Sequence, residues 1–178
     1  MLYEIKVQLK DIEPPIWRIL RVPSRTRLSR LHRILQRAMG WKGYHLYLFV
    51  IDGKPYGDRY MDRDCEVLDS RKLTLQEVFS RGRPSFIYEY DPGDSWQHEI
   101  KLLSTFEGET EEKLACVAGS RACPPEDCGG TPGYFDLLIA LSDPDHEDHD
   151  NLLEWVGGNF DPGDFDAAAV DRALKRLR

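Results

Sequence analysis

No stretch of this 178-residue sequence approaches the roughly 18 consecutive apolar residues that a membrane-spanning helix needs. No basic start is followed by an apolar run of signal-peptide length. Only four cysteines occur, which is too few to replace a hydrophobic core by disulfides. We therefore expect a cytoplasmic protein without a membrane partner, whose cysteines are free thiols. With 41% hydrophobic residues the chain can bury a core of its own.

The sequence also lacks the strongest short motifs of enzymes. It contains no G-x-S-x-G, no glycine-rich phosphate loop, no H-E-x-x-H and no C-x-x-C. These absences remove the best-marked classes of hydrolase, nucleotide-binding enzyme, zinc protease and thiol oxidoreductase. Whether the protein is an enzyme at all stays open at this point.

Acidic residues are missing from one long segment. Between Pro14 and Ile51 there is no Asp or Glu, whereas acids dominate from Glu107 onwards and the net charge is −7. The same acid-free segment carries eight positive charges, on Arg18, Arg21, Arg25, Arg27, Arg30, Arg33, Arg37 and Lys42. Two opposite fields can steer a partner or attract each other within the fold, and we favour the internal attraction.

Hydrophobic periodicity predicts the elements of the first half. Apolar residues alternate over 3–9 and 16–22, as in strands, and then recur at helical spacing over 28–39. We expect Thr26 to cap this helix and Gly40 to end it. A further strand follows at 45–51, a capping box at Thr74 and Glu77, and a hairpin over 85–103 whose turn is built on Pro92 and Gly93.

Strand patterns stop after Lys101, and the remaining chain predicts loops and helices. The fold class is therefore α+β: a mixed β-sheet with a β-grasp-like β-β-α-β start and a further β-hairpin, followed by a helical C-terminal cap. We expect a single domain over 1–178, in which 1–104 is mainly sheet plus one long helix and 105–178 is loops and helices.

The stretch "ACPPEDCGG", residues 122–130, permits two interpretations. A zinc site could use the cysteines with nearby histidines, the candidates being Cys116, Cys123, Cys128, His146 and His149. The cysteines are separated by six and four residues, whereas zinc ligands usually come in pairs two to four residues apart, and no C-x-x-C occurs, so this pattern is weak. We favour a rigid turn, in which the prolines stiffen the entry and the glycines allow positive φ or close backbone approach.

An acid–base group is the second candidate site. In "DPGDSWQHE" a carboxylate could orient His98, with Trp96 as a wall, and a metal-dependent or acid–base enzyme would then use Asp94, His98, Glu126 and Asp127. The alternative is a plain hairpin whose acids close the turn and whose histidine bonds locally.

A third candidate is nucleic-acid binding by the basic face of the first helix. Four arginines, Arg27, Arg30, Arg33 and Arg37, lie on one side of it and could track phosphates. The acidic pI near 5.3 and the lack of a known DNA-reading motif make a solvated or internally paired helix face the favoured interpretation.

Several stretches together resemble one known family. They are "LHRILQRAMGW", "HLYLFVIDG", "YEYDPGDSWQHEI", "CVAGSRACPPEDCGGTPGY" and "LLEWVGGNFDPGDFD". In this order they are similar to the plasmid pRiA4b ORF-3-like family, also called an insertion-element passenger protein family. The resemblance implies an α+β domain and an association with mobile genetic elements, but no established activity.

The family pattern includes three segments, residues 94–98, 123–130 and 155–161, and we expect these segments to meet at one concave surface. The residues expected on this ligand or partner surface are Trp96, His98, Glu126, Asp127, Trp155 and Asp161. The leading hypothesis is thus a non-catalytic binding module for a protein or small-molecule partner. The acid–base enzyme and the nucleic-acid binder remain the alternatives.

Overall fold

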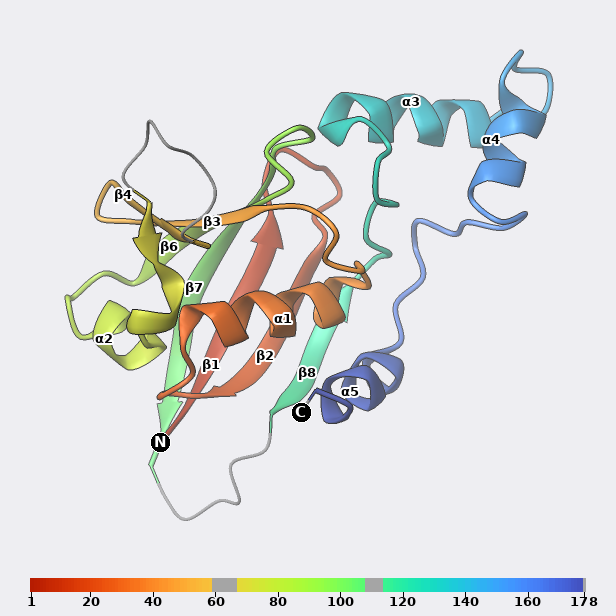
Figure 1. Cartoon of the computed structure of the whole chain (residues 1–178). Helices are drawn as coiled ribbons and strands as arrows, with labels where there is room; N and C mark the ends of the chain where they lie inside the picture. The colour runs from red at the N-terminus through yellow and green to blue at the C-terminus, as the bar shows by residue number, and fades with distance from the viewer. Residues whose placement is uncertain (59–66, 108–113, 178) are drawn as a thin grey trace.

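The computed structural model describes residues 1–58, 67–107 and 114–177, and within them eight strands form one sheet in the order β5-β4-β3-β6-β7-β1-β2-β8 (Figure 1). The strands are β1 (Leu2–Leu9), β2 (Trp17–Pro23), β3 (Tyr47–Ile51), β4 (Lys54–Gly57), β5 (Leu68–Asp69), β6 (Ser85–Tyr90), β7 (Trp96–Phe106) and β8 (Ala115–Ser120). All neighbours are antiparallel except β4 and β5, so the sheet is mixed, as predicted.

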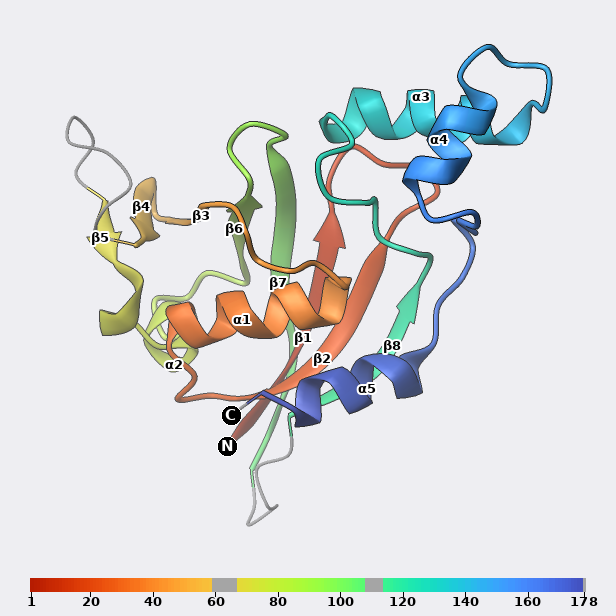
Figure 2. The ribbon, with the colours of Figure 1, turned by 45° about the vertical axis from the view of Figure 1, so that its right-hand side comes forward.

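The helix α1 (Leu28–Met39) lies across one face of the sheet (Figures 1 and 2). Alternate side chains of β1, such as Ile5 and Val7, are fully buried beneath it, because one face of a strand must be covered to form a core. The predicted β-β-α-β order is confirmed. In the sheet, the β6–β7 hairpin lies between β3 and β1.

The two predicted ends of α1 have different outcomes. Gly40 ends the helix in the left-handed conformation, with φ of 92°, as expected. At the other end the N-cap is Arg27 and not Thr26, and no side chain caps it. Thr26 is instead buried, and its carbonyl oxygen accepts a hydrogen bond from the backbone N–H of Leu75 (2.9 Å), so the backbone there pairs with another segment.

The predicted capping box is confirmed. It opens the short helix α2 (Leu75–Phe79), where the Glu77 backbone N–H donates to Thr74 Oγ1 (3.3 Å) and the Thr74 N–H donates to Glu77 Oε2 (2.8 Å). A single 3₁₀ turn, η1 (Ser70–Lys72), precedes it.

The expectation that 105–178 contains only loops and helices is wrong. Strand β7 continues to Phe106, and β8 adds a strand beside β2. The sequence of β8 is short and rich in small residues, so it lacks an alternating pattern. It becomes a strand because β2 offers it an edge. Small size is needed at Gly119, where an added Cβ would lie 2.5 Å from the ring of Phe165.

The predicted helical C-terminal cap is present as three helices. The helices α3 (Gly130–Ser142) and α4 (His149–Trp155) lie together beyond one end of the sheet, and α5 (Ala167–Lys175) lies beside β8 and α1 (Figures 1 and 2). None of the helices in the described residues is long and apolar enough to span a membrane.

A buried arginine joins the C-terminal segment to the sheet. Arg18 on β2 is only 3% exposed, and its guanidinium donates to the carbonyl oxygens of Ala38 (3.1 Å), Ser120 (2.9 Å) and Arg121 (2.9 Å). Its flat face lies 4.5 Å from the ring centre of Phe165. One side chain thus connects the end of α1, the end of β8 and the segment before α5.

We expect Arg18→Met to lower the free energy of unfolding by about 3 kcal/mol, because it leaves buried carbonyl groups without donors. The matched control is Arg21→Met on the same strand. Arg21 is partly exposed and pairs with Glu4 at the surface, so its loss should cost less than about 1 kcal/mol. Urea unfolding measures both values, and equal losses would contradict the role given to Arg18.

Candidate functional site

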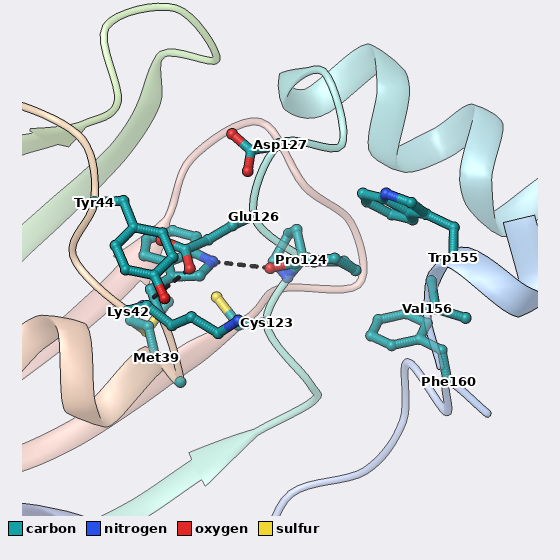
Figure 3. Close-up of a pocket in the computed structure, with 13 residues that line it drawn as sticks. Met39, Lys42, Tyr44, Cys123, Pro124, Glu126, Asp127, Trp155, Val156 and Phe160 are labelled. Carbon is teal, nitrogen blue, oxygen red and sulfur yellow. Dashed lines mark hydrogen bonds between the residues drawn. The ribbon is translucent and has the colours of Figure 1, made fainter. Parts of the chain in front are cut away.

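A hollow of about 460 Å³ opens between the end of α1, the 122–129 turn and the end of α4 (Figure 3). Figure 3 shows Tyr44, Lys42 and Glu126 on one side of this hollow and Trp155, Val156 and Phe160 on the other. Its lining comes from three parts of the chain that are far apart in sequence. We call it the first hollow.

The indole of Trp41 forms the base of this site. It is 3% exposed, stacks on Tyr90 at 5.0 Å between ring centres, and meets the edge of His98 at 5.4 Å. Its Nε1–H donates to the carbonyl oxygen of Pro124 at 2.9 Å. Because Gly40 ends α1 one residue earlier, the chain turns at that point and places Trp41 between the sheet and the turn.

Glu126 connects the same segments from the other side. Its Oε1 accepts a hydrogen bond from the Tyr90 hydroxyl (2.5 Å), and its Oε2 accepts one from the backbone N–H of Lys42 (3.0 Å). The Tyr90 hydroxyl also accepts from the backbone N–H of Tyr44 (3.1 Å). Burial, and then the hydrogen bond to Glu126, raise the pKa of Tyr90 above its ordinary value. The Tyr90 hydroxyl is therefore a permanent donor in this network.

The 122–129 turn is docked on the hairpin turn between β6 and β7. Asp94 Oδ2 accepts a hydrogen bond from the Gly129 backbone N–H (3.2 Å). Gly130 has φ of 68°, and a Cβ added there would lie 2.5 Å from the carbonyl oxygen of Asp94. Close backbone approach therefore requires glycine at this position, as the interpretation of "ACPPEDCGG" as a turn predicts.

A second hollow of about 300 Å³ lies next to the first. It is lined by residues of the turn, α3 and α4, and the two hollows share Asp127 and Trp155. Two aromatic side chains at the first hollow are well exposed: Tyr44 is 73% exposed and Trp155 is 48% exposed. Large exposed aromatic groups at a concavity are typical of binding surfaces.

The sequence of this chain is similar to those of known proteins. The family model described as "Plasmid pRiA4b ORF-3-like protein" matches residues 1–169. The chain belongs to the plasmid pRiA4b ORF-3-like family. It is 40% identical over 168 residues to the uncharacterized protein y4hQ of Sinorhizobium fredii, covering 94% of this chain and 84% of that protein.

A solved relative shares the fold. The crystal structure of protein MM3350 of unknown function from Methanosarcina mazei Go1 has a TM-score of 0.85 and 33% sequence identity. The match covers 94% of this chain and 95% of that one. The pRiA4b ORF-3-like fold therefore extends over nearly all of the chain, and the descriptions of these relatives assign no activity.

The structure does not gather the five zinc candidates. Among the described residues, no group of three ligand side chains that includes a cysteine lies within ligating range. Burial raises the pKa of Cys116 to about 11 and that of Cys128 to about 12, and it raises the pKa of Cys123 further, so the three free thiols stay protonated at neutral pH. His146 lies between α3 and α4, where its Nδ1 accepts the Asp148 N–H, and His149 begins α4, where its Nδ1 lies within hydrogen-bond range of Ala140 O.

The four acid–base candidates of this pRiA4b ORF-3-like chain occupy different environments. His98 is fully buried on β7, and its Nδ1 lies within hydrogen-bond range of the carbonyl oxygens of Trp96 (3.0 Å) and Tyr88 (3.3 Å). Asp94 contacts the turn, whereas Glu126 and Asp127 lie at the first hollow. The structure thus brings the three carboxylates to one region and leaves His98 beneath it, out of contact with solvent.

The expected ligand or partner surface is divided in the same way. Glu126, Asp127 and Trp155 line the first hollow, whereas Trp96 and His98 are buried below Trp41. The remaining member, Asp161, is exposed. Its carboxylate accepts the Gly163 backbone N–H in the turn at residues 161–164, which has the same sequence, DPGD, as the β6–β7 turn.

The four arginines of the basic face are all exposed, Arg27 as the N-cap of α1 and Arg30, Arg33 and Arg37 within the helix. Arg37 lines a further cavity together with Asp164 and Asp166, which precede α5. The acidic C-terminal segment therefore reaches one end of the basic helix.

Sequence reasoning did not assign Lys42, His45 and Phe160 to a site. Lys42 and Phe160 line the first hollow, and His45 contacts two aspartates. The only sequence feature that could have indicated Lys42 and His45 is "GWKGYH", in which two glycines follow a helix and frame aromatic and basic residues.

The buried His98 predicts a pH dependence of stability. Burial lowers its pKa to about 4, whereas the ordinary value in an unfolded chain is about 6.5. Between these values the unfolded chain binds a proton that the folded chain does not, so the free energy of unfolding falls as the pH falls from about 6.5 to about 4. Burial also lowers the pKa of His32 to about 4, so His32 contributes to the pH dependence in the same direction.

When the pH falls from 7.5 to 5, we expect the free energy of unfolding to drop by about 2 kcal/mol less in His98→Gln than in the wild type. Urea unfolding at both pH values measures this difference within each protein, so a lower starting stability of the variant does not affect it. Equal losses in the two proteins would mean that His98 takes up protons in the folded state.

Proposed function

We propose that the chain is a binding module, and that its occupant is an extended peptide segment of a partner protein. The observation that carries this proposal is the exposed indole of Trp155 between two adjoining hollows of about 460 and 300 Å³. Two concavities in a row suit an extended chain, which can place one side chain in each, better than a compact small molecule.

The character of the walls supports the same proposal. Tyr44 and Trp155 offer large aromatic surfaces that a bound segment would cover, and such residues dominate the energy of most interfaces. The side chains of Lys42 and Asp127 supply a polar rim that can orient the occupant. The hydrogen bonds of Trp41 and Glu126 hold these walls in place before binding, which lowers the entropic cost of association.

The alternatives receive less support. An acid–base enzyme built on Asp94, His98, Glu126 and Asp127 would need His98 to reach a substrate, yet this side chain is fully buried. A nucleic-acid site on the exposed arginines of α1 predicts binding that falls steeply with added salt. The association with mobile genetic elements, drawn from the family resemblance, also stays a prediction.

We expect a display library of random 12-residue peptides, screened on the full chain, to yield peptides that bind one to one without being altered. Because Tyr44 and Trp155 would be covered by the bound peptide, Tyr44→Ala and Trp155→Ala should each weaken binding of the best peptide at least about tenfold. Fluorescence anisotropy of the labelled peptide measures the dissociation constants.

The control variant is Phe135→Ala, which removes a comparably exposed aromatic side chain on α3 that lines neither hollow. It should leave the affinity unchanged. The proposal fails if the double variant at Tyr44 and Trp155 binds as tightly as the wild type. Salt-sensitive binding of duplex DNA that is lost in Arg27→Ala and Arg30→Ala would favour the nucleic-acid alternative instead.

A further inference from the structure

Three side chains with metal-binding atoms meet beside the first hollow. His45 follows α1, Asp91 follows β6, and Asp127 belongs to the 122–129 turn. One possible ligand atom from each lies within 4.8 Å of the other two, and no second group of this kind occurs among the described residues. We propose that His45, Asp91 and Asp127 bind a divalent metal ion of the first transition series, in the range from Mn²⁺ to Zn²⁺.

The Nε2 atom of His45 is the ring nitrogen that would bind the ion, because an imidazole coordinates one ion through a single nitrogen. This Nε2 lies 2.9 Å from Asp127 Oδ1, and the Nδ1 of the same ring lies 3.6 Å from Asp91 Oδ2. Although Nε2 is buried and close to a carboxylate, it makes no hydrogen bond. Two ligand atoms that each lie about 2.1 Å from one ion and at a right angle to each other, as in octahedral coordination, are about 3 Å apart, and both point at the ion rather than at each other. A short N···O contact without hydrogen-bond geometry is the arrangement that such an ion produces.

The charges of the group favour a cation. Two carboxylates face one imidazole, and in the described parts of the chain the ion pairs of Asp91 and Asp127 are both with His45. The Asp91 side chain is only 12% exposed, and a carboxylate in such a place is costly unless it is compensated. Its Oδ1 accepts the Gly93 backbone N–H (3.0 Å), which leaves Oδ2 on the side of His45.

Hydrogen bonds of the neighbouring backbone hold the three residues in position. The Asp91 backbone N–H donates to Leu46 O (2.9 Å), and the His45 backbone N–H donates to the Tyr90 hydroxyl (3.4 Å). One imidazole nitrogen with carboxylate oxygens suits ions from Mn²⁺ to Zn²⁺. The Asp127 side chain is 64% exposed and its carboxylate points away from Trp155 (Figure 3), so water can complete the coordination.

The test uses Mn²⁺ alone, because this ion prefers oxygen and nitrogen ligands and avoids the cysteine thiols. Electron paramagnetic resonance measures free Mn²⁺ during titration of the full chain. We expect one ion per chain, and we expect His45→Gln and Asp127→Asn each to weaken binding at least about tenfold. The control Asp145→Asn removes a carboxylate from the exposed acidic loop before α4 and should bind Mn²⁺ like the wild type.

A second measurement does not depend on whether the variants fold. Bound Mn²⁺ should broaden the amide NMR signals of the wild type around His45, Asp91 and Asp127 before those of the acidic loop. Absence of binding at millimolar Mn²⁺, broadening confined to the acidic loop, or unchanged affinity in His45→Gln would each overturn the proposal. No peptide is present in these experiments, so their failure and that of the proposed peptide groove are separate results.

Discussion

The burial of Trp41 is the interaction on which the rest of the site depends. Its ring fills the space between the sheet and the 122–129 turn, and its Nε1–H satisfies the carbonyl oxygen of Pro124. A buried indole whose only polar atom has a partner contributes both apolar area and direction. The loop after α1 and the turn before α3 therefore take their positions from the same side chain, although more than eighty residues separate them.

Two adjacent acids in the 122–129 turn have different roles. Glu126 is used internally, since both of its oxygens accept hydrogen bonds from the chain. Asp127 is exposed and lines both hollows as well as contacting His45. Its φ of 62° is unusual for a residue other than glycine and turns the chain sharply. Glu126 thus holds the turn in place, while the adjacent Asp127 presents its carboxylate to solvent.

Local chemistry accounts for the elements that were predicted correctly. The apolar period of α1, the stop at Gly40 and the capping box at Thr74 depend on residues within a few positions of each other. The β6–β7 hairpin is equally local, because its strands are joined by one tight turn. Of the candidate site, the interpretation of "ACPPEDCGG" as a turn rests on prolines and glycines whose preferences hold in any context.

What could not be read in advance depends on long-range partners. Strand β8 has no alternating pattern and exists because β2 has an edge to pair with. Nothing near His98 in sequence shows that Trp41 covers it.

The sequence by itself determined the fold class, the end of α1 at Gly40 and the turn at residues 122–129, because these follow from backbone preferences and local periodicity. The tertiary structure alone decided which polar residues meet. His45, Asp91 and Asp127 come together, and His98 is left out, because packing around Trp41 brings three distant loops to one end of the sheet.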